Sequence, residues 1–159
     1  MTAALAMREQ PPESQRFAQI LLASEGRQIP DSAIARVVEL AQPEGASVRV
    51  LSIARVHGVA FGLPNPGLLP TKREWDEQRE IVAKAVKRLK RQGLSATGHV
   101  LGTRKATKAI CAEAAMHECE AIVMAADPDR NRFTGDMLWT QEPQRVRRRA
   151  KVPVFLVTE

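Results

Sequence analysis

The chain has 159 residues, of which 44% are hydrophobic and 26% are charged, with a formal net charge of +6. This length suits one globular domain that buries a real core. No apolar run approaches the roughly 20 residues of a membrane-spanning helix, which argues against an integral membrane protein. Aromatic residues make up only 4% and tyrosine is absent, so stacking platforms for nucleic-acid bases are scarce.

The first residues, 1–15, are expected to form a flexible N-terminal arm in front of one domain over residues 16–159. The apolar start lacks the basic flank of a secretory signal and is followed by an acidic, proline-containing stretch. Cys111 and Cys119 are expected on one helical stretch, about two turns apart, which is too far for a mutual disulfide. These features favour a reduced, cytoplasmic protein.

Strands and helices are expected to alternate from residue 17 onward. Residues 17–23 (FAQILLA) form a short apolar run that predicts a buried strand, and the β-branched run 48–56 predicts a second. Apolar residues between them recur at helical spacing: Ile34, Val37, Val38 and Ala41. Residues 57–70 carry three glycines and three prolines, which predict a long surface loop.

The middle of the chain predicts two more helices around a third strand. Thr71 and Glu74 match a capping box, which predicts the start of a long helix that ends at Gly93. A weaker strand is expected at about residues 94–101, followed by a helix at about 104–117.

The last third predicts two strands separated by a polar loop and a helix. Residues 121–126 (AIVMAA) are apolar throughout, as buried parallel strands are. Pro143 indicates a kink or a late start in the helix that follows, and residues 152–157 (VPVFLV) predict the closing strand. The alternation favours a single doubly wound α/β domain with a parallel sheet and helices on both faces, and with any ligand site at the carboxyl ends of the strands.

Several segments of the domain carry a family likeness. The strand and turn at residues 20–27 (ILLASEGR) have the form of two or three aliphatic residues followed by a short polar turn. Arg145 and Val146, followed by residues 149–157 (RAKVPVFLV), have the form of a last helix and a final Pro-Val strand. Together with AIVM at 121–124, they resemble the universal stress protein family over about residues 16–159. The resemblance implies a Rossmann-like, five-stranded parallel sheet of order 3-2-1-4-5.

The same resemblance implies a homodimer, often formed by antiparallel pairing of the last strands. The expected interface is the apolar edge formed by Val154, Phe155, Leu156 and Val157. Such an edge is an aggregation hazard unless it is paired, and pairing across a two-fold axis would remove the hazard. The first expected partner is therefore a second copy of the chain, and an unidentified protein partner is left open.

Family members that bind ATP carry Gly-x2-Gly-x9-Gly-Ser/Thr after the fourth strand, where glycines let backbone N–H groups approach the phosphates. The three glycine positions are occupied here, in two alternative alignments, by Asp127, Arg130 and Thr140 or by Ala125, Pro128 and Leu138. Asp127 and Asp129 would also place negative charge beside a triphosphate. The resemblance therefore implies a member without the usual phosphate loop, for which no cofactor is firmly predicted.

An adenine nucleotide, ATP or AMP, is the alternative ligand for a divergent loop. It would place adenosine at the end of the first two strands and phosphates at the loop after the fourth. The candidate contacts are Ser24, Glu25, Gly26, Ile53, Ala125, Arg130, Thr140 and Gln141. A plain turn, in which Gly26 supplies a positive φ, explains the Glu25–Gly26 pair equally well, and loop arginines such as Arg130 are more often simply solvated.

No catalytic or metal-binding pattern stands out. The three histidines have no cysteine or carboxylate at a metal-ligand spacing. The Gly-x-Ser-x-Gly, Walker A and Gly-x-Gly-x-x-Gly motifs are missing from their expected places. The basic cluster at residues 145–151 fits a solvated helix end better than a nucleic-acid surface. The leading hypothesis is a non-enzymatic, homodimeric regulatory or stress-response protein, with an adenine-nucleotide binding module as the alternative.

Overall fold

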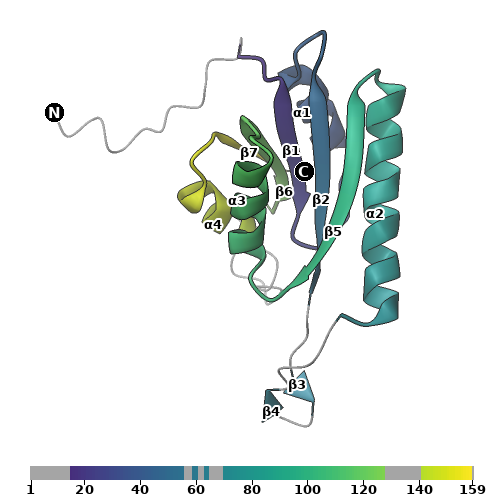
Figure 1. Cartoon of the computed structure of the whole chain (residues 1–159), viewed down its shortest axis with the longest axis vertical. Helices are drawn as coiled ribbons and strands as arrows, with labels where there is room; N and C mark the ends of the chain where they lie inside the picture. Colours follow the sequence, from purple (N-terminus) through teal and green to yellow (C-terminus); the bar gives the residue numbers. More distant parts are fainter. Residues whose placement is uncertain (1–14, 56–58, 61–62, 65–69, 128–140, 159) are drawn as a thin grey trace, which may run out of the picture.

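The computed structural model describes residues 15–55, 59–60, 63–64, 70–127 and 141–158 (Figure 1). The expected N-terminal arm, apart from its last residue, lies outside this part of the chain. Five parallel strands form the main sheet: β1 (Gln19–Ser24), β2 (Ser47–Arg55), β5 (Ser95–Thr103), β6 (Ala121–Ala126) and β7 (Val154–Thr158). Their spatial order is β5-β2-β1-β6-β7. Counted along the chain, this is the expected order 3-2-1-4-5.

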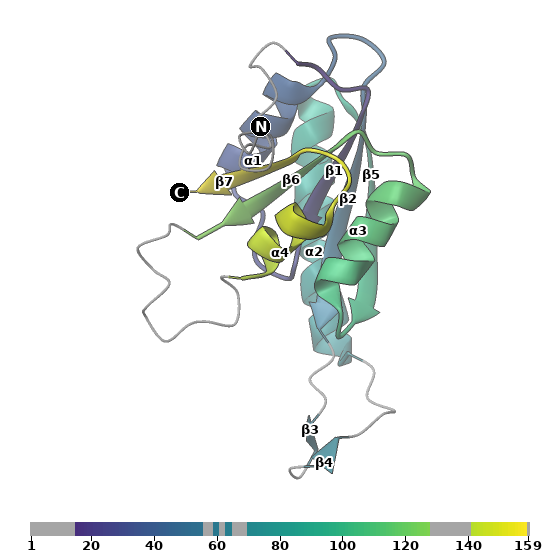
Figure 2. The same cartoon turned by 90° about the vertical axis from the view of Figure 1, so that its left-hand side faces the viewer.

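In the described part of the chain, four helices cover the two faces of this sheet (Figures 1 and 2). One face is covered by α1 (Asp31–Leu40) and α2 (Lys72–Arg91), and the other by α3 (Ala106–Met116) and α4 (Glu142–Arg149). Because successive strand residues point to opposite faces, Leu22 packs under the first helix pair and Leu21 under the second. The Rossmann-like, doubly wound α/β architecture expected from the sequence is confirmed.

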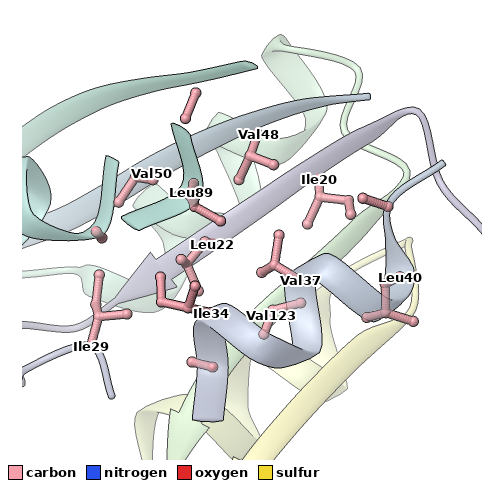
Figure 3. Close-up of a cluster of buried hydrophobic side chains, with 14 of the residues drawn as sticks. Ile20, Leu22, Ile29, Ile34, Val37, Leu40, Val48, Val50, Leu89 and Val123 are labelled. Carbon is pink, nitrogen blue, oxygen red and sulfur yellow. The ribbon is translucent and has the colours of Figure 1, made fainter. Parts of the chain in front are cut away.

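The core under α1 and α2 is the larger of the two (Figure 3). It interleaves aliphatic side chains of the central strands with those of the helices: Ile20, Leu22, Val48, Val50 and Val123 from the sheet, and Ile34, Val37, Leu40 and Leu89 from the helices. These side chains are at most 6% exposed. Their burial fixes β1 at the centre of the sheet, between β2 and β6.

Capping residues, glycine and proline set the helix ends close to where the sequence predicts them. The Thr71 hydroxyl accepts a hydrogen bond from the Glu74 amide at 3.1 Å, so the expected cap of α2 is present. Gly93 follows α2 with φ +83°, a left-handed conformation that favours glycine. Pro143 lies in the first turn of α4, which agrees with a late helix start because proline has no N–H to donate there.

Some expectations need correction. The stretch expected as an uninterrupted loop contains a short antiparallel pair, β3 (Val59–Ala60) and β4 (Leu63–Pro64). The last strand begins at Val154 rather than residue 152, because Pro153 directly before it has no amide to donate to the ladder. Cys119 follows α3 instead of sharing its helical stretch with Cys111. Within the described residues, no helix is long and apolar enough to cross a lipid bilayer.

Candidate functional site

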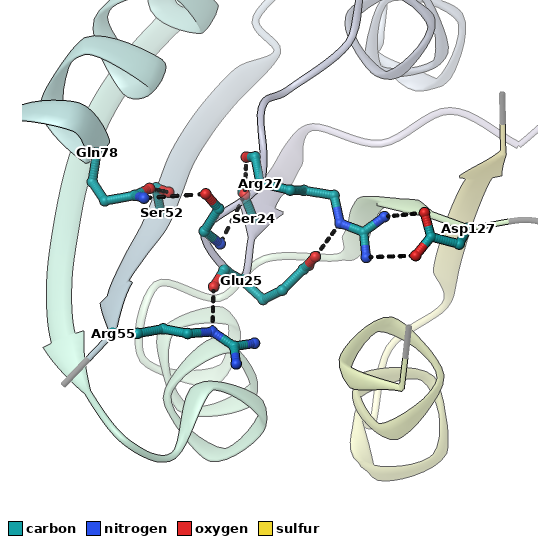
Figure 4. Close-up of polar contacts among 8 residues, drawn as sticks. Ser24, Glu25, Arg27, Ser52, Arg55, Gln78 and Asp127 are labelled. Atoms are coloured by element: carbon teal, nitrogen blue, oxygen red, sulfur yellow. Dashed lines mark hydrogen bonds and ion pairs between the residues drawn. The ribbon is translucent and has the colours of Figure 1, made fainter. Parts of the chain in front are cut away.

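The carboxyl ends of the central strands gather a group of polar side chains (Figure 4). The chain leaves β1 at Ser24, β2 at Arg55 and β6 at Ala126, and these strands are neighbours in the sheet. The crossover direction reverses between β1 and β6, because β1 leads to β2 on one side while β6 lies on the other. In doubly wound folds, ligands bind at such a reversal.

Arg27 lies between two carboxylates at this position (Figure 4). Its Nε donates to Glu25 Oε1, and its Nη1 and Nη2 atoms lie 3.1 and 3.5 Å from the two carboxylate oxygens of Asp127. The contact joins residues that are 100 positions apart in the sequence. The turn after β1 is thereby tied to the first residue after β6, so the reversal point is bridged by an ion-pair network.

Glu25 is a fully buried acid, with a relative exposure of 0%. Burial raises its pKa above the ordinary value for glutamate, and the charges of Arg27 and Arg55 act against that rise. Arg55 donates through Nε to the Glu25 backbone oxygen at 3.2 Å. Within the described residues, Glu25 Oε2 is buried and has no hydrogen-bond partner. Only one oxygen of this buried carboxylate is therefore satisfied by the described part of the chain.

The turn that carries Glu25 is held by its own polar groups. Ser24 Oγ accepts from the Gly26 amide at 3.1 Å and donates to the Arg27 carbonyl. Gly26 has φ +129°, in the region where side chains are disfavoured. Gly26 therefore supplies the positive φ of the turn, as one of the two interpretations of the sequence expects.

A glutamine on α2 connects that helix to the turn. Gln78 is buried; its Nε2 donates to the Gly26 carbonyl at 3.1 Å, and its Oε1 accepts from the Ser52 hydroxyl. Neither Gln78 nor Ser52 was predicted from the sequence as part of the site. The available signal was a glutamine on the apolar face of an amphipathic helix, because a buried amide needs hydrogen-bond partners.

A pocket of about 640 Å³ opens between this turn and α2. Its charged lining residues carry both signs: Arg27, Lys84, Glu77, Glu80 and Asp127. Glu77 and Glu80 are already paired on the helix, with Arg73 at 3.1 Å and Lys84 at 3.2 Å. The pocket is therefore a polar cleft with nearly balanced charge rather than a concentrated anion site.

The structure separates the candidate nucleotide contacts. Ser24, Glu25 and Gly26 lie together in the turn, whereas Ile53 is fully buried in the core under α3 and α4. Ala125 is half-buried in β6, and Gln141 is an exposed residue before α4 that accepts a hydrogen bond from Arg145 at 3.2 Å. Neither Ile53, Ala125 nor Gln141 lines the pocket. Arg130 and Thr140 lie outside the described residues.

The model of the universal stress protein family matches residues 16–158 of the chain. The chain belongs to this family. Members of the family are generally regulatory proteins rather than enzymes, and they often form homodimers. No curated protein matches the chain by sequence.

Solved universal stress proteins share the fold at low sequence identity. One from Archaeoglobus fulgidus, in complex with dAMP, is 21% identical with a TM-score of 0.64, over 88% of this chain and 97% of its own. One from Burkholderia pseudomallei is 20% identical with a TM-score of 0.63, over 89% and 96%. Another, in complex with cAMP, is 16% identical with a TM-score of 0.62, over 91% and 98%. These likenesses establish a common fold.

Proposed function

We propose that this chain is a non-enzymatic, homodimeric universal stress protein that acts by association and does not bind ATP in the way of the members with a glycine-rich loop. The observation that carries the proposal is the position of Arg27 between Glu25 and Asp127. The chain's own guanidinium bridges the ends of β1 and β6, where a nucleotide would otherwise lie. Asp127 adds negative charge at the start of the segment that would approach the phosphates.

The nucleotide prediction is tested by calorimetric titration with ATP, ADP and AMP, each with and without magnesium. We expect no saturable heat up to about 1 mM nucleotide, because a ligand would have to displace the Arg27 ion pairs and approach Asp127 without glycine amides. The protein must first be shown to carry no co-purified nucleotide. Binding tighter than about 100 μM, a free energy of roughly −5.5 kcal/mol, would contradict the proposal.

One observation favours the alternative, an adenine-nucleotide module with a divergent loop. Glu25 Oε2 is buried without a partner in the described part of the chain, so it is available to a ligand's hydrogen-bond donor. Relatives solved with dAMP and cAMP show that the fold accepts adenine nucleotides. If titration detects binding, the variants Glu25→Gln and Arg130→Ala should weaken it, whereas Lys151→Ala, an exposed residue after α4, should not.

The edge position and the partial exposure of β7 support homodimerisation through this strand. It is the outer strand beyond β6, and its side chains at Val154, Leu156 and Val157 remain partly exposed. An apolar outer strand without a charge or bulge is a surface that a second copy would cover. Antiparallel pairing of two such strands would give an isologous interface.

The variant Leu156→Lys should convert the dimer into a monomer, because a lysine on the outer strand must be desolvated when two edges pair. Sedimentation velocity should report about twice the 17.5 kDa chain mass for the unmodified protein and the single-chain mass for the variant. Thr97→Lys, on the opposite outer strand β5, is the matched control and should remain dimeric. A dimer that survives Leu156→Lys but dissociates with Thr97→Lys would place the interface on β5 instead.

A further inference from the structure

The outer strand β5 lacks the features that usually keep a sheet edge from pairing. It is nine residues long, and each residue from Ser95 to Thr103 faces one residue of β2, so the register contains no bulge. Its sequence, SATGHVLGT, contains no proline, lysine, arginine, aspartate or glutamate. Among the described residues no strand pairs with its outer side. Such an edge offers a row of backbone donors and acceptors to an added strand.

A shallow groove runs beside this edge, between β5 and α2, which lie next to each other in Figure 1. We call it the α2–β5 groove and define it by Trp75, Val82, Ala83 and Val86 of α2 with Gly98 and Val100 of β5. Two adjoining pockets of about 450 and 580 Å³ share Ala83 and Val86 and so form one continuous surface. Most of the residues that line the groove are apolar, and His99 of β5 and Arg79 of α2 complete the lining of the first pocket.

Gly98 shapes this groove. A Cβ built on Gly98 would lie 2.3 Å from Val82 Cγ1, so only glycine lets α2 approach the strand this closely. Gly98 is nevertheless exposed, which leaves backbone of β5 accessible at the groove. A strand added to β5 would therefore place its inward side chains against the apolar stripe of α2.

The rim of the groove is basic. Arg79, Lys87, Lys90 and Arg91 line the two pockets, and no acidic residue does so among the described lining residues. Arg79 has a partner in Asp76 at 3.3 Å and also lies over the Trp75 ring. Lys87, Lys90 and Arg91 are exposed, and the described part of the chain places no carboxylate within ion-pair distance of them. An occupant must therefore supply negative charge.

We propose that the α2–β5 groove binds an extended acidic segment of another protein, which adds to β5 as a further strand. The lengths agree, since nine strand residues span about 30 Å and the helix from Trp75 to Arg91 spans about 24 Å. On the side that faces α2, the segment would combine apolar residues over the groove with acidic residues near the rim, because side chains on its other side point away from α2. A second copy of this chain is a poor occupant, because two-fold pairing of β5 edges would bring two basic rims together.

The test uses the full-length protein and four labelled nonapeptides with threonine at every second position. The positions between the threonines carry both glutamate and one apolar residue, which is valine, isoleucine, leucine or phenylalanine, so that both kinds of side chain face α2. At least one should bind with a Kd of about 50 μM at low salt, and its counterpart with lysine for glutamate should bind at least about tenfold more weakly. Amide signals of residues 97–101 and the Trp75 indole signal should shift on binding. The β5 amides should also gain protection from hydrogen exchange, which charge attraction alone would not produce.

Two charge-reversal variants separate the groove from the general basicity of the chain. Lys87→Glu/Lys90→Glu should weaken binding about tenfold, whereas Lys108→Glu/Lys151→Glu, with the same change in net charge on the α3–α4 side, should change it less than about twofold. The proposal is overturned if both pairs weaken binding equally, if the shifts map elsewhere, or if none of the peptides binds at about 1 mM. Loss of the dimer in Lys87→Glu/Lys90→Glu would also overturn it, because a second copy would then occupy the groove.

Discussion

Replacement of Arg27 by alanine should lower the free energy of unfolding by about 3 kcal/mol at neutral pH. Arg27 is only 17% exposed at its side chain and pairs with the fully buried Glu25. Removal of one member of a buried ion pair leaves the other charge desolvated and uncompensated, and this loss is much larger than the net contribution of the intact pair. Urea denaturation monitored by circular dichroism measures the change directly.

The loss should depend on pH with a defined sign. Burial raises the pKa of Glu25, and Arg27 is the strongest influence that lowers it. Without Arg27 the pKa in the folded protein should rise further above its value in the unfolded chain. A raised folded-state pKa means that the protonated form stabilises the fold, so stability is highest below the unfolded pKa and declines as pH rises through the folded pKa. The difference between Arg27→Ala and the unmodified protein should therefore be small near pH 4 and should grow as the pH rises toward 7.

Glu25→Gln provides the control, since it removes the buried charge and keeps the side-chain shape. In the Glu25→Gln background, Arg27→Ala should cost less than about 1 kcal/mol, because no buried carboxylate is left unpaired. An equal loss in both backgrounds would mean that Arg27 acts through packing or through Asp127 alone. The same cycle bears on function, because nucleotide binding that appears only in Arg27→Ala would identify the guanidinium as the group that blocks the site.

The sequence carries most of the information about the sheet. Ala121–Ala126 could be located to the residue because an unbroken apolar run is bounded by Glu120 and Asp127. The predicted start of the last strand lies two residues too early, because residues 152 and 153 belong to the same apolar run. Pro153 accepts a hydrogen bond from the Ile122 amide at 2.9 Å but has no amide of its own to donate. The short β3–β4 pair escaped prediction because glycine and proline density dominates the local pattern there.

The candidate site was less accessible to sequence reasoning. Glu25 and Gly26 could be found because they follow the first buried strand, and ligands bind at strand carboxyl ends. The role of Arg27 could not be found, because its partner Asp127 is 100 positions away and reaches it only through the β1–β6 pairing. In the sequence, Asp127 indicates only that a phosphate would be repelled. In the structure, its carboxylate also pairs with the guanidinium of Arg27.

Phe155 of the last strand is predicted at the dimer interface from the sequence but lies in the core of the single chain. Phe155 was expected at the dimer interface, yet its side chain is only 8% exposed within the single chain. Its ring packs edge-on against Phe17, with centroids 5.9 Å apart, and the Arg36 guanidinium lies 5.2 Å from the ring centroid. These contacts place the ring in the core under α1, so the proposed dimer interface would consist of the strand backbone and the partly exposed neighbours of Phe155.

Phe155→Ala should therefore lower the stability of the isolated chain by about 3 kcal/mol, the loss typical of a buried aromatic ring. The measurement is best made by urea denaturation in the monomeric Leu156→Lys background, because dimer dissociation would otherwise make the apparent stability depend on concentration. Val157→Ala, on the same face but partly exposed, is the matched control and should cost about 1 kcal/mol. If Phe155→Ala leaves the urea midpoint unchanged in that background but weakens the dimer in the unmodified one, the ring acts across the interface rather than in the core.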